Sequence, residues 1–232
     1  DTTPPAPPAI TSPADFSNTF TQNIITFSGT SESGALITQN FDATSTIAAG
    51  GTWSIVLNLS QGTSTIQFFT ADSAGNKSEA TEITLFIDSI GPDLTFDIAE
   101  CSNSLSSGCL STSTTATLLW SSAASDLANY ELNCETGGAA CAGFPKTHSA
   151  TSSVASSENL NDFTFYTFTL KATDQIGNQT QSTKTIETAS LPVIVNEIAW
   201  MGTKSTLTAD EWIELKNNTS QAISLNNWIL RT

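Results

Sequence analysis

Two short stretches of the chain carry a carboxylate in a repeated pattern that could bind a metal ion. TADSAGNKS contains Asp72 and ATDQIGNQT contains Asp174, and both read Asp-x-x-Gly-Asn. Calcium prefers carboxylate oxygens but takes six to eight oxygen ligands, whereas each stretch offers one carboxylate. The pattern also suits a hairpin turn, because Asp bonds the backbone two residues on and Gly adopts a positive φ. We therefore expect a structural turn in both places, with calcium binding at Asp72 and Asp174 as the alternative. The turn residues are Asp72, Gly75 and Asn76 in the first copy and Asp174, Gly177 and Asn178 in the second.

The four cysteines could form either a zinc site or two disulfides. They are Cys101, Cys109, Cys134 and Cys141. A zinc site usually shows a Cys-x-x-Cys pair and often histidines, but that pair is absent and His148 is the only histidine. Two disulfides are the better interpretation, and of the three possible pairings we favour Cys101–Cys109 and Cys134–Cys141, because each closes a short loop. Disulfides indicate an oxidising compartment, so we expect an extracellular or cell-surface location.

The remaining reactive residues form no catalytic pattern. A single histidine leaves no Ser-His-Asp arrangement to test, and we place His148 in a surface loop. Asp210, Glu211 and Glu214 lie close together, and Glu197 could lie on a neighbouring strand. Strand alternation puts Glu211 on the opposite face from the other two, so we interpret these residues as acids that face solvent rather than a glycosidase pair. We therefore predict a protein that is not an enzyme and holds no cofactor.

Composition excludes two classes of partner. The 232 residues include only seven basic ones and have a net charge of −15. Such a surface repels phosphate backbones, so we expect no nucleic-acid binding. The sequence has no apolar run as long as a spanning helix, so we expect no membrane insertion of this segment.

Short runs with period-two alternation predict an all-β fold. In the stretch GGTWSIVLNLSQGTSTIQFFTADSAGN, two alternating runs are broken at Gln61-Gly62. When the two turns are aligned, the strands before them share one inward face. Its members are Ile66, Phe68 and Thr70 in the first copy and Phe168, Leu170 and Ala172 in the second. This pattern predicts tandem Ig-like β-sandwiches.

Pro-bearing joints suggest the domain boundaries. The stretch DSIGPD resembles the opening DTTPPAP, at a spacing close to the length of an Ig-like domain. We predict a Pro-rich linker at 1–9 and a first sandwich at 10–88. A second sandwich with two disulfide loops follows at 89–189, and 190–232 begins an incomplete third sandwich.

Three stretches carry resemblances to known families. GGTWSIVLNLSQGTSTIQFFTADSAGNKS resembles bacterial Ig-like repeats of secreted and surface proteins, and LLWSSAASDLANYELN is similar to bacterial Ig-like or fibronectin-III-like modules. PVIVNEIAWMGTKSTLTADEWIELKNNTSQAISLNNWILR resembles the start of a lamin-tail domain of the bacterial secreted type. The elements that match are Asn196-Glu197-Ile198 with Trp200, then Asp210 to Leu215, then Ile223-x-Leu225 with Trp228.

The resemblance implies a non-catalytic extracellular structural or adhesive protein, either a stalk or a fibre subunit of a bacterial cell surface. The lamin-tail-like stretch would have one apolar face and no opposing sheet. We therefore expect residues beyond Thr232, or another chain, to supply the missing strands. Partners would be other protein domains or copies of the chain itself, joined by strand addition or end-to-end contact. The alternative is an ancillary, carbohydrate-binding region of a larger secreted enzyme.

Overall fold

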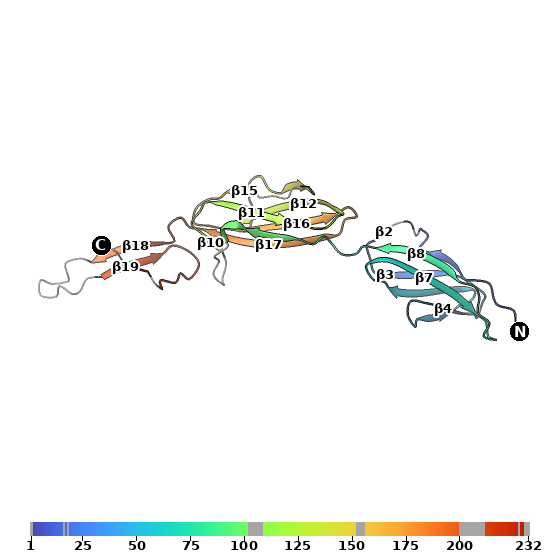
Figure 1. Ribbon diagram of the computed structural model, residues 1–232. Helices are drawn as coiled ribbons and strands as arrows, with labels where there is room; N and C mark the ends of the chain where they lie inside the picture. Colours follow the sequence, from blue (N-terminus) through green and yellow to red (C-terminus); the bar gives the residue numbers. More distant parts are fainter. Residues whose placement is uncertain are drawn as a thin grey trace. The chain divides into compact units, whose positions relative to one another are not determined.

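The computed structural model describes residues 2–15, 17, 19–101, 109–151, 156–199, 212–226 and 228–229. The chain forms two compact units, Asp1–Ile90 and Gly91–Thr232, and each is described by itself (Figure 1). Among the described residues the only helical element is one 3₁₀ turn, η1 (Ala99–Cys101). The predicted all-β class, with the stacked sheets of Ig-like sandwiches, is confirmed.

The first unit contains a three-stranded and a five-stranded sheet. The smaller sheet has the antiparallel order β1 (Ala9–Ser12), β3 (Ile24–Thr30), β6 (Thr52–Asn58). The larger sheet has the order β2 (Thr19–Phe20), β8 (Thr81–Ile87), β7 (Gly62–Ala71), β4 (Leu36–Gln39), β5 (Ser45–Ile47). Its strands pair antiparallel except β2, which runs parallel to β8.

The core of the first unit follows from alternation along its strands. In β7, Ile66, Phe68 and Thr70 are fully buried, so the predicted inward face is confirmed. The ring of Phe68 packs against Phe27 and Trp53, with centroid distances of 5.2 and 5.3 Å. Each large apolar side chain buried in this way contributes about 1.5–3 kcal/mol to stability.

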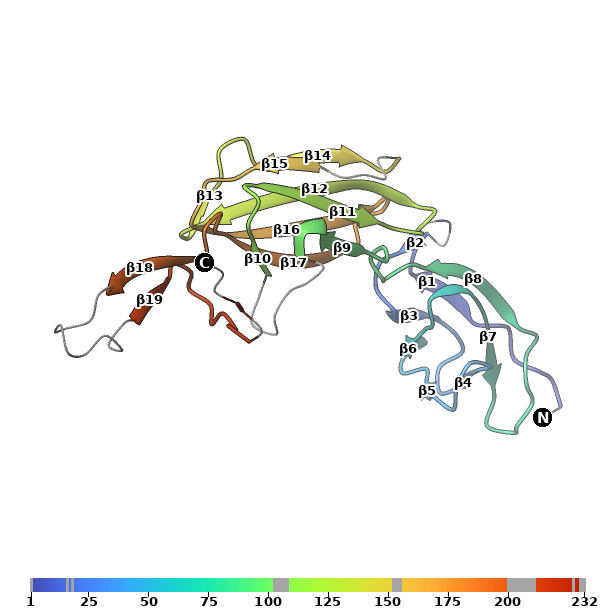
Figure 2. The ribbon, with the colours of Figure 1, turned by 60° about the vertical axis from the view of Figure 1, so that its left-hand side comes forward.

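The second unit contains three sheets. One has the order β15 (Ser156–Asn159), β11 (Thr115–Ser121), β9 (Thr95–Ile98). The opposing sheet has the order β10 (Cys109–Ser111), β17 (Gln179–Thr188), β16 (Thr164–Asp174), β12 (Leu127–Thr136), β13 (Ala139–Ala140), and β14 (Lys146–Ser149) also pairs with β12. The third sheet is the hairpin β18 (Val193–Ala199) and β19 (Trp212–Asn217) (Figure 2).

The core of the second unit repeats the pattern of the first. Phe168, Leu170 and Ala172 of β16 are fully buried, which confirms the second copy of the predicted inward face. The hydroxyl of buried Tyr166 accepts a hydrogen bond from the backbone N–H of Asn161 at 2.9 Å. Ig-like domains form this kind of bond at a corner where a strand begins.

The predicted domain limits can be placed on these units. The boundary between Ile90 and Gly91 falls within the Pro-bearing joint 88–93. The Pro-rich start is tied to the first sandwich, because Thr81 Oγ1 donates to the carbonyl of Pro8 at 2.6 Å and Ala9 begins β1. The stretch 190–232 belongs to the second compact unit.

Candidate functional site

The turn at Asp72 holds its carboxylate entirely with groups of its own loop. Oδ1 of Asp72 accepts hydrogen bonds from the backbone N–H groups of Ala74 and Asn76, both at 2.9 Å. Oδ2 accepts from the side-chain amide of Asn76 at 2.8 Å. Gly75 has φ +89°, a conformation that glycine adopts without strain. Each residue of the Asp-x-x-Gly-Asn pattern therefore has a role in the geometry of this turn.

These bonds predict a pH-dependent contribution from Asp72. The Asn76 amide, with backbone N–H groups of the turn, lowers the pKa of Asp72 below its usual value. A lowered pKa in the folded state stabilises the protein above the ordinary carboxylate pKa, and this stabilisation is lost as pH falls through the folded-state value. We expect Asp72→Asn to destabilise the protein at pH 7, and to do so much less in strong acid. Urea unfolding at both pH values tests this, and an equal effect at both would contradict it.

The second copy of the turn has the same backbone but a different carboxylate environment. Oδ1 of Asp174 accepts from the N–H groups of Ile176 at 3.0 Å and Asn178 at 2.8 Å, and Gly177 has φ +99°. The Asp174 side chain is only 3% exposed, whereas Asp72 is half-buried. Its Oδ2 is buried and has no hydrogen-bond partner. The turn therefore uses one of the two carboxylate oxygens of Asp174.

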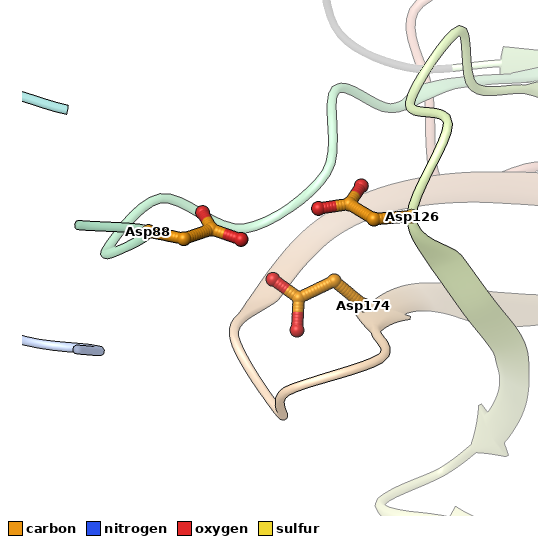
Figure 3. A group of neighbouring side chains, drawn as sticks. All are labelled: Asp88, Asp126 and Asp174. Atoms are coloured by element: carbon orange, nitrogen blue, oxygen red, sulfur yellow. The ribbon is translucent and has the colours of Figure 1, made fainter. Parts of the chain in front are cut away.

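Asp126 lies beside Asp174, although no pattern in the sequence singles it out. Strand β12 begins at Leu127, which is paired with Asp174 at the end of β16, and the N–H of Gln175 donates to the carbonyl of Asp126 at 2.8 Å. Carboxylate oxygens of Asp126 and Asp174 lie within 4.8 Å of each other (Figure 3). Only the pairing of β12 with β16 could have revealed this, because the two residues are far apart in sequence.

Both disulfides are the local pairs that the sequence favoured. Cys101 at the end of η1 is bonded to Cys109 at the start of β10, and Cys134 of β12 is bonded to Cys141 after β13. The N–H of Cys141 also donates to the carbonyl of Cys134 at 2.9 Å. All four sulfurs are therefore used in disulfides, and no thiolate remains to bind a metal.

The prediction that His148 lies in a surface loop is wrong. His148 belongs to strand β14, is half-buried, and packs on Trp120 with ring centroids 4.9 Å apart. Its Nε2 and the Nε1 of Trp120 are both buried and have no hydrogen-bond partner in the structure. The prediction relied on the Ser/Thr-rich sequence around His148, which is typical of a loop. In the structure this sequence forms strand β14, which pairs with β12.

The described acidic residues of the C-terminal hairpin face solvent. Glu197 of β18 is paired in register with Glu214 of β19, and both are exposed. The side-chain amide of Asn196 donates to Glu214 at 2.6 Å. Asp210 and Glu211, like Trp200, lie outside the described residues.

A buried carboxylate of the second sandwich contacts the segment that follows β19. Glu187, near the end of β17, is 6% exposed and accepts from the N–H of Ser220 at 2.8 Å and from its hydroxyl at 2.6 Å. The hairpin itself exposes large apolar side chains. They are Val195, Ile198, Trp212, Ile213 and Leu215.

Comparison with known proteins finds similarity only at the level of fold. No protein-family model matches the chain. No curated protein matches it significantly. The described part of the chain contains no helix with the length and hydrophobicity of a membrane span.

Several solved structures share the sandwich architecture. A structure from a 1.5-MDa bacterial ice-binding adhesin is 16% identical, with 80% of this chain and 66% of that chain covered and a TM-score of 0.44. Fibronectin(III)-like modules of Clostridium thermocellum CbhA are 14% identical, with 78% and 94% covered and a TM-score of 0.32. A tetra-tandem repeat in the extending region of a large adhesion protein is 16% identical, with 82% and 52% covered and a TM-score of 0.32.

The chain therefore spans about two thirds of the adhesin structure and about half of the tandem-repeat structure. TM-scores below 0.5 carry no inference about activity, ligand or partner. None of these three descriptions names a lamin-tail domain, so that resemblance of residues 190–232 stays a prediction. The chain is similar in fold to Ig-like and fibronectin-III-like modules, among them modules of bacterial adhesins.

Proposed function

We propose that the chain is a non-catalytic extracellular structural or adhesive protein, a stalk or fibre subunit of a bacterial cell surface. The observation that carries this proposal is the β18–β19 hairpin, whose apolar side chains face water. Ile198 is paired in register with Ile213, which shares a face of β19 with Leu215, and the three are 60%, 37% and 41% exposed. Exposed apolar side chains that lie close together in this way mark an interaction surface.

A two-stranded sheet with such side chains gains stability by adding strands. An isolated hairpin is marginally stable in water, because it has no opposing layer to cover its apolar face. Its outer edges also carry backbone N–H and C=O groups that another strand can pair with. The partners of the proposed function are therefore other protein domains or copies of this chain, joined by strand addition.

The two sandwiches would serve as a support for the apolar surface of the hairpin. Each sandwich is closed around its own core of buried side chains, and two disulfides brace the second one. Disulfides of this kind persist in oxidising surroundings, which supports an extracellular location. The net charge of −15 opposes nonspecific association between copies, so contacts would be confined to matching surfaces.

Electron microscopy of native material tests the proposal. Regular filaments would identify a fibre subunit, and isolated rods would identify a stalk. Compact particles in which this chain is attached to a catalytic domain would contradict both and favour the ancillary region of a secreted enzyme.

Substitution of Leu215 tests the role of the hairpin. A buried Leu contributes about 1.5–3 kcal/mol, and a difference of about 1.4 kcal/mol is tenfold in affinity. Leu215→Lys should therefore weaken association between copies, measured by analytical ultracentrifugation, by about tenfold or more. Leu119→Lys is the matched control, because Leu119 is 42% exposed but lies on β11, which already has β15 and β9 on its two edges. Equal effects of the two variants, or a wild-type chain that stays monomeric, would contradict pairing between copies.

A further inference from the structure

The two oxygens of the Asp174 carboxylate have unequal surroundings. Oδ1 is held by the turn, where it accepts from the N–H groups of Ile176 and Asn178. Oδ2 is buried without a hydrogen-bond partner, in a side chain that is 3% exposed. A carboxylate oxygen removed from water with neither a donor nor a cation beside it is strongly unfavourable. A cation beside Oδ2 of Asp174 would therefore stabilise the folded chain.

The carboxylate of Asp126 adds a second negative charge close to that of Asp174. Its carboxylate lies within 4.8 Å of that of Asp174, and both point into the same space (Figure 3). Two carboxylates at this separation repel each other when both are ionised. Strand pairing of Leu127 with Asp174 and the bond from Gln175 to the Asp126 carbonyl hold the backbones in place, so the two acids cannot easily separate. Asp88, also drawn in Figure 3, belongs to the first unit and is not included in this site.

None of the ion pairs between described residues relieves this charge. Those pairs are Lys146–Glu158, Lys171–Glu131 and Lys184–Asp97. Lys171 lies three residues before Asp174 on β16, but successive residues of a strand alternate between its faces. The Lys171 Nζ instead lies 3.0 Å from Glu131 on the neighbouring strand.

We propose that Asp174 and Asp126 bind a calcium ion, with Oδ2 of Asp174 and the carboxylate of Asp126 as ligands. Calcium takes oxygen ligands at about 2.3–2.6 Å in flexible geometry, so two ligand oxygens on one ion can be up to about 5 Å apart. Carboxylate oxygens of Asp174 and Asp126 lie within 4.8 Å of each other, which meets this condition. Water and further oxygen atoms complete the coordination. Magnesium suits the site less well, because it demands near-ideal octahedral geometry at about 2.0–2.1 Å.

The first copy of the turn provides an internal comparison. Asp72 accepts hydrogen bonds at both carboxylate oxygens, from Ala74 and from Asn76, so it lacks the unpartnered oxygen of Asp174. The Asp-x-x-Gly-Asn pattern thus forms the same turn twice, and only the second copy presents an oxygen to a cation. This inference is independent of the proposed function.

Calcium titration of the whole 232-residue chain tests the site. The protein is treated with EDTA, dialysed into calcium-free buffer and then given calcium chloride, with sodium chloride at equal ionic strength as the salt control. We expect binding in the range of extracellular calcium modules, with Kd of about 10⁻⁴–10⁻³ M. At about 10 mM calcium the unfolding equilibrium should then shift toward the folded state by about tenfold or more. Equilibrium dialysis and thermal unfolding measure the two quantities.

Two matched variants separate the site from the general charge of the protein. Asp174→Asn and Asp72→Asn each remove one negative charge, and Asn can still accept the turn bonds through its Oδ1. We expect Asp174→Asn to abolish the calcium response and to be at least as stable as the wild type without calcium. Asp72→Asn should keep the full calcium response, and Asp126→Asn should reduce it at least tenfold in affinity.

Three results would overturn the proposal. The first is a wild-type chain that shows no calcium response beyond that of sodium chloride. The second is an equal loss of response in Asp72→Asn and Asp174→Asn, which would show general screening of an acidic protein. The third is an equal response to magnesium chloride, which would remove the assignment to calcium.

Discussion

Replacing Phe168 with alanine is expected to lower the free energy of unfolding of the second unit by about 3–5 kcal/mol. Phe168 is fully buried, and its ring lies 6.3 Å from that of Tyr166 and 6.2 Å from that of Phe144. Truncation removes the apolar area of the ring and leaves a cavity that a rigid pair of sheets can fill only partly. A domain stable by about 5–15 kcal/mol in total would lose a large share of its stability.

Phe68→Ala is the matched variant in the first unit. Phe68 is also fully buried, lies on the aligned strand β7, and belongs to a core cluster that shares no residue with the cluster of Phe168. We therefore expect differential scanning calorimetry to show two unfolding transitions. Each variant should lower the midpoint temperature of only one of them. A single transition that both variants lower equally would show one cooperative core instead of two.

The buried faces of β7 and β16 could be predicted because alternation is a local property of the sequence. A strand whose one face is covered by a second sheet must place apolar side chains at every second position. Ile66, Phe68, Leu170 and Ala172 follow this rule without interruption, and all four are fully buried. The turns that follow these strands could also be predicted from the sequence, because Asp and Gly act there through bonds to neighbouring residues.

The surroundings of His148, Asp126 and Asp174 could not be predicted in the same way, because they depend on pairing between distant segments. His148 is half-buried only because β14 joins the edge of β12 and brings it to Trp120 on the opposing sheet. Asp126 reaches Asp174 only through the pairing of β12 with β16. A single sequence records which face of a strand is apolar, but it does not record which strand lies beside it.

The candidate calcium site illustrates the difference between pattern and environment. Asp72 and Asp174 were indistinguishable as letters in a motif, and one carboxylate in each loop argued against calcium at either place. The structure distinguishes them by one atom, since Oδ2 is hydrogen-bonded in Asp72 and buried without a partner in Asp174. The second carboxylate comes from Asp126, outside the motif.

Gly29→Ala is expected to destabilise the first unit by about 3 kcal/mol or more. Gly29 lies in β3 between Ile10 of β1 and Trp53 of β6. A Cβ atom at this position would lie 1.8 Å from the carbonyl oxygen of Ala9 and 2.9 Å from the Trp53 ring. Overpacking of a core typically costs about 1–3 kcal/mol, but here the obstacle is backbone that cannot rotate away. Strand β1 would have to separate from β3 to make room.

Gly50→Ala is the control that separates this clash from a loss of backbone freedom. Gly50 has φ +60° and nothing within 4 Å of an added Cβ, so its substitution should cost only the backbone strain of about 1–2 kcal/mol. Gly29 has no such positive φ, so its cost should come from the clash alone. Urea unfolding of both variants measures the difference, and hydrogen exchange should show loss of protection in β1 for Gly29→Ala only. If Gly29→Ala costs less than Gly50→Ala, then β1 does not pack against β3 as closely as the structure indicates, because a carbonyl oxygen at 1.8 Å leaves no room for a methyl group.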